Sequence, residues 1–199
     1  MEISCCGLKL AVPGSVYLPS DDSVMLAEAV VGLRGNVLEI GCGSGVASLA
    51  AAKTAESVLG VDINPEAVKC AKANGEKNRI ANASFIESDL FAAVPSDAKF
   101  DAILFNPPYL PTKKGERVRG PLNHAFDGGK DGRSVIDRFL AGFGTRLKPG
   151  GELILVQSSL NGTGKTLAVL EKAGYKVEIT DEKAFFFEKL YVVRARKRV

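Results

Sequence analysis

The feature that most constrains the fold is a glycine-rich turn between a buried strand and a helix. Residues 36–40 (Asn-Val-Leu-Glu-Ile) predict the strand, and Gly41-Cys-Gly-Ser-Gly45 predicts a tight turn. The residues from Val46 to about Lys53 predict the helix. Parallel α/β folds that bind nucleotides open in this way, because glycine lets the backbone approach a ligand at the helix N-terminus. The chain is therefore predicted to be an α/β protein with a Rossmann-like, doubly wound sheet.

Two acidic residues near this turn restrict the ligand. Asp62 follows the apolar strand predicted for residues 58–61, about twenty residues after the turn, where an acid accepts hydrogen bonds from ribose hydroxyls. Each such charge-assisted bond contributes roughly 1.5–3 kcal/mol. Glu39 would repel a pyrophosphate and favour an ammonium group, although its alternative role is to accept hydrogen bonds from helix N–H groups. S-adenosylmethionine, which carries an ammonium and no phosphate, is the expected cofactor.

A second junction between strand and turn carries the residues best suited to chemistry. Residues 102–105 form a short apolar run without helical spacing, which predicts a central strand of a parallel sheet. Pro107 and Pro108 end this strand, because proline fixes φ, lacks an N–H and keeps the preceding residue out of helical conformation. Asn106 is therefore expected to lie extended at the carboxyl end of the sheet, where open α/β sheets bind ligands.

The residue types at this junction suit the binding of a planar NH2 group. The side-chain oxygen of Asn106 and the main-chain carbonyl of Pro107 are both acceptors, and an amide or exocyclic amine offers two N–H donors. Tyr109 offers a ring to stack on the planar group, worth about 0.5–1.5 kcal/mol. The alternative is a proline-rich loop with an incidental tyrosine. Asn106, Pro107 and Tyr109 are predicted to be catalytic, with Pro108 as a further substrate contact.

The N-terminal residues predict a small hairpin and a helix. Residues 8–12 alternate weakly and residues 16–18 form the expected second arm, with a proline-glycine turn between them. Asp22 and Ser23, with the aspartate before them, offer an N-cap for an apolar helix over residues 24–31. The alternative role of Asp22 and Ser23 is to form a wall of the cofactor pocket.

The next segments continue the alternation of helix and strand. Asn64 and the proline after it predict the start of a helix that ends at Asn74-Gly75, and residues 83–87 predict a strand. Asp89 and Leu90 follow that strand. There a carboxylate would accept the exocyclic amine of adenine while the leucine lies against the ring; the alternative is a simple turn aspartate.

The second half of the chain opens with a long polar loop over residues 110–132, which is predicted to face the substrate as a lid. Its charged and titratable residues include Lys113, Lys114, Arg117, Arg119 and His124. Further elements are expected as helix 134–146, turn 148–151, strand 152–156, helix 165–173, strand 176–180 and a last strand over about 190–195. For Phe185-Phe-Phe187 core packing is expected, with a protein-contact patch as the alternative.

The length and composition exclude several classes. A chain of 199 residues is predicted to form a single domain, with residues 1–34 as a hairpin and helix over the cofactor pocket and residues 35–199 as the catalytic core. The four cysteines lack Cys-x-x-Cys spacing and there is one histidine, so neither a disulfide framework nor a zinc site is expected. Without a signal peptide or an apolar span, the protein is expected to be cytoplasmic and not membrane-bound.

One segment imitates a phosphate-binding loop. Residues 161–166 (Asn-Gly-Thr-Gly-Lys-Thr) follow a strand and open a helix. The phosphate-loop pattern requires a glycine at the position held by Ser159. We expect a polar turn that caps a helix, and a nucleotide triphosphatase remains the distant alternative.

Four motifs in this order resemble class I S-adenosylmethionine-dependent methyltransferases: Glu39-Ile-Gly-Cys-Gly-Ser-Gly45, Val61-Asp-Ile-Asn64, Ser88-Asp-Leu90 and Asn106-Pro-Pro-Tyr109. The last motif resembles the HemK/PrmC family, which methylates the glutamine side-chain amide in the Gly-Gly-Gln loop of peptide-chain release factors. Residues 17–23 and 124–133 resemble its eukaryotic and archaeal branch. The resemblance implies a seven-stranded sheet, mostly parallel with an antiparallel last strand. It also implies a set of cofactor-binding residues: Tyr17, Asp22, Ser23, Glu39, Gly41, Gly43, Gly45, Asp62, Ile63, Asp89, Leu90 and Asn106.

The resemblance further implies a release factor as substrate and a small zinc-binding activator subunit as partner. Ser23 stands where this branch commonly has threonine, a change that keeps the hydroxyl. N6-adenine methylation of DNA or RNA is the nearest alternative, because the same acceptors would bind an exocyclic amine; lysine methylation is another. A net charge of +3 on one domain disfavours nucleic acid as a partner.

Overall fold

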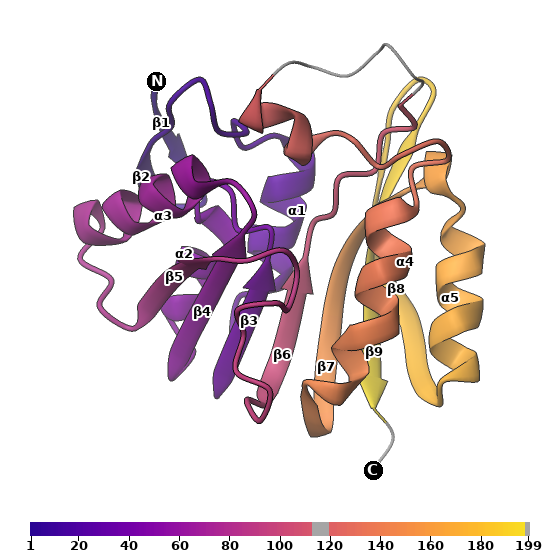
Figure 1. The fold of residues 1–199 in the computed structure, drawn as a ribbon. Helices are drawn as coiled ribbons and strands as arrows, with labels where there is room; N and C mark the ends of the chain where they lie inside the picture. Colours follow the sequence, from indigo (N-terminus) through magenta and orange to yellow (C-terminus); the bar gives the residue numbers. More distant parts are fainter. Residues whose placement is uncertain (113–119, 198–199) are drawn as a thin grey trace.

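The structure is a computed structural model that describes residues 1–112 and 120–197. Its largest element is a twisted sheet whose strands are β3 (Asn36–Ile40), β4 (Ser57–Asp62), β5 (Ala83–Glu87), β6 (Phe100–Phe105), β7 (Leu147–Ser158), β8 (Tyr175–Ala184) and β9 (Lys189–Lys197). Their order across the sheet is β5-β4-β3-β6-β7-β9-β8 (Figure 1). The strands from β5 to β7 are parallel, and β9 is antiparallel to both of its neighbours. The predicted seven-stranded sheet with an antiparallel last strand is confirmed.

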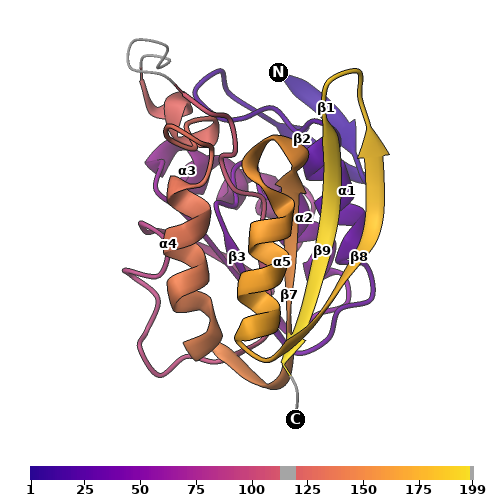
Figure 2. The same ribbon diagram turned by 90° about the vertical axis from the view of Figure 1, so that its right-hand side faces the viewer.

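Helices cover both faces of this sheet (Figures 1 and 2). One face carries α1 (Asp21–Ala29), α2 (Val46–Ala52) and α3 (Pro65–Lys77), and the other carries α4 (Ser134–Gly142) and α5 (Thr163–Lys172). Short 3-10 helices, η1 (Pro121–Ala125), η2 (Phe143–Thr145) and η3 (Ser159–Asn161), join them. Within the described residues, no helix is both long and apolar enough to cross a membrane.

Strand β6 shows why the sheet is central. Ala102 and Leu104 pack into the cluster beneath α1, α2 and α3, whereas Ile103 and Phe105 pack into the cluster beneath α4 and α5. All four side chains are buried, because successive residues of a strand point to opposite faces and both faces are covered. The continuous apolar run is thus explained, and its carboxyl end is held rigidly.

The N-terminal hairpin exists and the predicted strand over residues 8–12 is one of its arms, but the predicted second arm is wrong. It pairs β1 (Glu2–Cys5) with β2 (Leu8–Ala11) around a turn at Cys6 and Gly7, both of which have positive φ. Residues 16–18 form no strand. The first observed arm gives little sequence signal because it has only four residues, none of which is fully buried.

Two helix boundaries also differ from the prediction. The cap of α1 is Ser20, so Asp22 and Ser23 lie inside the first turn, where Asp22 is buried and accepts from the Ser23 N–H at 2.6 Å. The predicted stop at Asn74-Gly75 is wrong, because α3 continues to Lys77. Asn74 is buried inside the helix and its side chain bonds the backbone of Ala11 and Ser44, a tertiary role that local sequence does not reveal.

Two expectations in the C-terminal half are corrected as well. Residues 148–151 do not precede a strand; they form an irregular stretch inside β7, where the register with β6 shifts. Phe185, Phe186 and Phe187 do not pack in the core: their exposures are 40%, 91% and 86%. They lie at the tip of the β8–β9 hairpin, which extends beyond the helices that cover the sheet (Figure 2).

Candidate functional site

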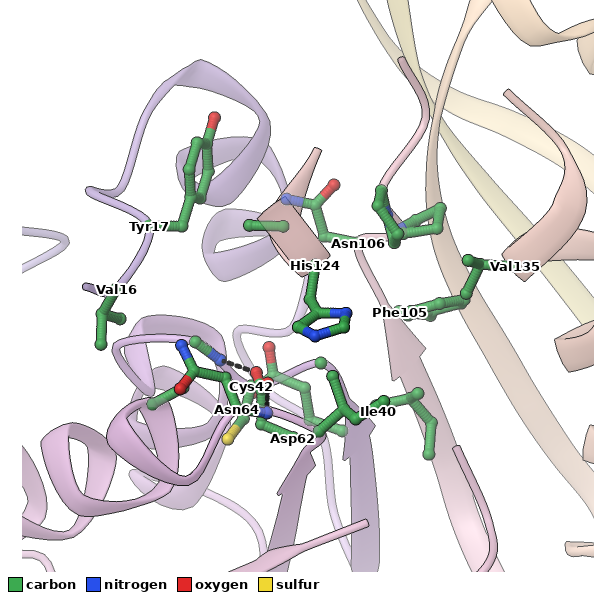
Figure 3. Close-up of a pocket in the computed structure, with 18 of the residues that line it drawn as sticks. Val16, Tyr17, Ile40, Cys42, Asp62, Asn64, Phe105, Asn106, His124 and Val135 are labelled. Atoms are coloured by element: carbon green, nitrogen blue, oxygen red, sulfur yellow. Dashed lines mark hydrogen bonds between the residues drawn. The ribbon is translucent and has the colours of Figure 1, made fainter. Parts of the chain in front are cut away.

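The carboxyl ends of the parallel strands surround a cavity of about 390 Å³. It lies where β3 separates β4 from β6, which is the position at which the chain reverses its direction across the sheet. Open α/β sheets bind ligands at this switch point, and the volume is in the range of pockets for small molecules. Figure 3 shows the side chains of strand ends and connecting loops that converge on it.

Most of the residues predicted to bind cofactor or substrate line this cavity. They are Tyr17, Asp22, Ser23, Glu39, Gly41, Gly43, Asp62, Ile63, Asp89, Leu90, Asn106, Pro107 and Pro108. Gly45 and Tyr109 are not among the lining residues. Gly45 is the N-cap of α2 with φ of 85°, and a Cβ there would lie 3.0 Å from the Ala71 Cβ. Its role is therefore close packing of α2 against α3.

Asp62, at the end of β4, holds the glycine-rich turn. One carboxylate oxygen accepts the Gly43 N–H at 2.9 Å and the other accepts the Asn64 N–H at 2.9 Å. Burial raises the pKa of Asp62, and these backbone hydrogen bonds and the nearby His124 oppose that shift. Each oxygen retains acceptor capacity toward the cavity, because a carboxylate has about four lone-pair sites.

Glu39 is buried behind the turn and contacts both the cavity and α2. It lines the cavity, and it accepts a hydrogen bond from the Ser48 hydroxyl of α2. Burial raises the pKa of Glu39 to about 8, with the Ser48 hydrogen bond opposing the shift and Asp62 adding to it. The carboxyl is therefore largely protonated at neutral pH, and a cationic group in the cavity would favour its ionised form.

Asn106 lines the cavity and carries an acceptor without a hydrogen-bond partner in the described part of the chain. Its Oδ1 is buried and has no hydrogen-bond partner among the described residues. Leaving a buried acceptor unpaired costs about 1–3 kcal/mol. Pro107 and Pro108 continue the cavity wall beyond it. This turn is consequently prepared to accept hydrogen bonds from a ligand that carries N–H groups.

Tyr109 connects the proline turn to α1. Its hydroxyl donates to Asp22 Oδ2 at 3.4 Å, and the Tyr17 hydroxyl lies 3.2 Å from each oxygen of the same carboxylate. Burial, followed by the Asp22 charge, raises the pKa of both tyrosines, so both hydroxyls stay protonated. The Tyr17 ring also packs edge-on against Phe126 at 5.4 Å. The proposed stacking of Tyr109 on the substrate remains a prediction. In the structure the Tyr109 hydroxyl instead connects the proline turn to Asp22 of α1.

The loop after Tyr109 packs closely against the turn. Gly132 has φ of 72°, and a Cβ there would lie 2.4 Å from the Tyr109 carbonyl oxygen. Arg133, which is buried, donates to the Asn161 carbonyl at 2.7 Å and to the Asp137 carboxylate at 2.7 Å. The glycine permits the close approach and the arginine fixes the loop to η3 and α4.

The same arginine argues against a phosphate loop at residues 161–166. Arg133 also contacts the Gly162 carbonyl at 3.2 Å and the Thr166 hydroxyl at 3.1 Å. The polar groups of this turn are thus used inside the protein, and Thr166 is fully buried. The segment behaves as the expected polar turn at the start of α5.

Several cavity residues come from the segments that sequence reasoning treated as lid and helix. They are Leu122, Asn123, His124, Ala125, Val135 and Arg138. Figure 3 shows the His124 ring entering the cavity from η1 above the strand end that carries Asp62. Arg138 of α4 pairs with Asp89 at 2.7 Å. Neither contact could be predicted, although His124, as the only histidine, was a usable signal. The basic residues Lys113, Lys114, Arg117 and Arg119 lie outside the described residues.

The strand order, the carboxylate at the end of β4 and the acceptor-lined turn after β6 define a class I S-adenosylmethionine-dependent methyltransferase. Residues 21–187 match the methyltransferase small domain family. The chain belongs to this family, which confirms the class that the motifs predicted.

Individual relatives are consistent with this assignment. A protein from Methanocaldococcus jannaschii named as a protein N5-glutamine methyltransferase is 48% identical over 197 residues, which is 98% of each chain. Human methyltransferase HEMK2 is 31% identical over 80% of this chain and 79% of its own length. This chain spans 31–63% of the length of bacterial relatives named release factor glutamine methyltransferase.

Among solved structures, the Mtq2–Trm112 complex of E. cuniculi is described as responsible for methylating the translation termination factor eRF1. The matched chain has a TM-score of 0.72 and 27% identity, and the match covers 92% of this chain and 99% of that one.

Proposed function

We propose that this chain methylates the side-chain amide nitrogen of the glutamine in the Gly-Gly-Gln motif of a peptide-chain release factor. The observation that carries the proposal is the buried Oδ1 of Asn106, which has no partner within the described chain. A glutamine amide offers two N–H donors, and Asn106 Oδ1 and the Pro107 carbonyl are the acceptors suited to them. Relatives named for glutamine methylation support this substrate.

S-adenosylmethionine supplies an electrophilic methyl group when it is bound. The residues present fit this cofactor: Asp62 has free acceptor capacity for ribose hydroxyls, and Glu39 can ionise opposite an ammonium group. Asp89 and Leu90 lie at the next strand end, where the adenine is expected. The His124 ring lies in the same cavity (Figure 3).

The chain contributes orientation and charge stabilisation. An amide nitrogen is a poor nucleophile because its lone pair is delocalised into the carbonyl. Acceptors that hold both hydrogens fix the direction of the nitrogen and favour positive charge on it during transfer. The nitrogen becomes acidic as it is methylated, so its proton can leave to water afterwards, and no side-chain base is required before transfer.

The proposal includes a small zinc-binding activator subunit. Its support is the solved complex in which Mtq2 is paired with Trm112. Because translation takes place in the cytoplasm, a release-factor substrate places the enzyme there.

The test is incubation of the chain, alone and with a Trm112-like subunit, with labelled S-adenosylmethionine and a release factor. We expect label on the glutamine of Gly-Gly-Gln, located by mass spectrometry, and none when that glutamine is changed to asparagine. Parallel reactions contain DNA, RNA and lysine-rich protein. Label only in nucleic acid or on lysine would replace the proposal with the corresponding alternative.

A further inference from the structure

Three consecutive phenylalanines form an exposed tip on the β8–β9 hairpin. Phe186 and Phe187 are 91% and 86% exposed, and their rings contact each other edge-on at 4.5 Å. Burial of each ring would be favourable, so leaving both in water is unfavourable unless another molecule covers them. Paired exposed aromatic rings of this kind mark a protein-contact surface.

The tip is a defined structure. The Phe185 N–H donates to the Glu188 carbonyl at 2.7 Å, and Ala184 pairs with Lys189 immediately before the turn. A tight turn of this kind presents the two rings without a large loss of conformational entropy on binding.

This tip adjoins the substrate end of the site. Strand β8 runs in the same direction as β7, so it ends at the edge of the sheet where the parallel strands also end (Figure 1). The cavity lies at this edge. Lys183, at the base of the tip, pairs with Asp21 at 2.7 Å, and the next residue, Asp22, accepts from Tyr109. The Lys189 N–H donates to the Ser159 hydroxyl at 3.0 Å, which ties the other arm to η3.

Exposed leucine side chains extend the surface, and Glu188 beside the tip carries an unpaired acceptor within the described residues. Leu18, Leu110 and Leu160, from the segments next to Tyr17, Tyr109 and Ser159, are 41%, 39% and 48% exposed. Glu188 Oε1 is buried and has no hydrogen-bond partner in the described part of the chain. Burial, Asp22 and Tyr17 raise the pKa of Tyr109 most, and the charge of Glu188 raises it further. Glu188 therefore lies close to the proline turn. An incoming polypeptide would supply apolar groups that cover these leucine side chains.

We propose that the hairpin tip, defined by Phe185, Phe186, Phe187 and Glu188, docks the folded release factor outside its Gly-Gly-Gln loop. This inference rests on the proposed function. A permanently bound subunit or a second copy seated here would occupy a surface that adjoins the proline turn, beside the entry of the substrate. The release factor itself is the occupant that can cover this surface and fill the turn at the same time.

The test compares an intact release factor with a short peptide that contains Gly-Gly-Gln. In the double variant Phe186→Ser/Phe187→Ser, we expect KM for the intact factor to rise about tenfold or more, because contacts of exposed aromatic anchors are lost. The kcat for the intact factor and both constants for the peptide should stay unchanged. Val31→Ser is the control, since Val31 is 73% exposed but lies outside the proposed surface.

Each other outcome overturns the inference in a recognisable way. Unchanged kinetics on both substrates would mean that the tip does not dock the factor, although the proposed function would stand. An equal loss on both substrates would assign the tip to the reaction centre. A change in sedimentation with unchanged kinetics would identify a second copy as the occupant. All reactions contain the proposed activator subunit; no methylation of either substrate by the unaltered enzyme under these conditions would remove the proposed function, and this inference with it.

Discussion

At the scale of single residues, the reaction depends on an acceptor that the fold leaves unpaired. We expect Asn106→Ala to lower kcat by about 100-fold or more, the usual effect of removing one group that stabilises developing charge. Cofactor affinity should change little. The substitution removes no hydrogen bond of Oδ1 within the described residues, so the free energy of unfolding should not fall for that reason. Single-turnover transfer and calorimetric titration measure the two quantities. Full turnover by the variant would exclude the amide-binding mechanism.

Glu39 gives the site a defined dependence on pH. Its pKa is raised from 4.5 to about 8, so the folded chain binds more protons than the unfolded chain between these values. The free energy of unfolding of the free enzyme should therefore decrease as the pH rises through this window. The cofactor's ammonium favours the ionised form, so binding at pH 7 should release about one proton and strengthen up to about pH 8.

The substitution Glu39→Gln separates this effect from others. Glutamine can still accept the Ser48 hydroxyl, but it cannot ionise. Titration with S-adenosylmethionine in two buffers of different ionisation enthalpy counts the protons released. The variant should release none from this position, and an unchanged proton count would assign the linkage to another group.

At the scale of elements, the sequence predicted the helices and strands whose signal lies within a few neighbouring residues. Strand β5 has the predicted bounds, and the strand, turn and helix from Asn36 to Ala52 agree closely, because apolar runs and glycine turns are encoded over a few residues. The end of α3 was not predictable from local sequence, since Asn74 is buried inside the helix and bonds the distant backbone of Ala11 and Ser44. The entry of His124 and Arg138 into the cavity depends on how separate elements pack, which spacing along the chain does not contain.

The packing of the 126–133 loop on the proline turn is testable through one glycine. Gly132→Ala places a Cβ 2.4 Å from the Tyr109 carbonyl oxygen at a φ of 72°, so the loop and the turn must separate. We expect unfolding free energy to fall by about 2 kcal/mol or more, and methyl transfer to fall with it. Urea denaturation and turnover measure these effects. Gly164→Ala in α5 is the matched control, because a Cβ there meets nothing within 4 Å and alanine favours a helix; equal effects of the two changes would contradict the steric argument.

At the scale of the whole molecule, the cavity joins parts that are distant in sequence. The segment before α1, the ends of the parallel strands, η1 and α4 all contribute to its walls. A ligand that contacts all of these parts binds the folded chain and not the unfolded chain. It therefore raises the free energy of unfolding by mass action. At a concentration of 100 times Kd this amounts to about 2.7 kcal/mol, or a rise in Tm of about 5–10 °C for a chain of this size.

Asp62 is the residue through which that stabilisation can be tested, because it braces the glycine turn and faces the cavity. We expect Asp62→Ala to weaken S-adenosylmethionine binding about tenfold or more, which removes at least about 1.4 kcal/mol of the ligand-dependent stabilisation. The loss of the bonds to Gly43 and Asn64 should also lower the Tm of the free variant. Thermal melts over a range of cofactor concentrations separate the two effects. The lost hydrogen bonds lower the Tm at every concentration, whereas the lost affinity lowers it only when cofactor is present. Asp97→Ala, at an exposed turn outside the cavity, should keep the full ligand-dependent shift. A full shift in Asp62→Ala would mean that the cofactor is held elsewhere, because no other carboxylate ends β4 beside the glycine turn.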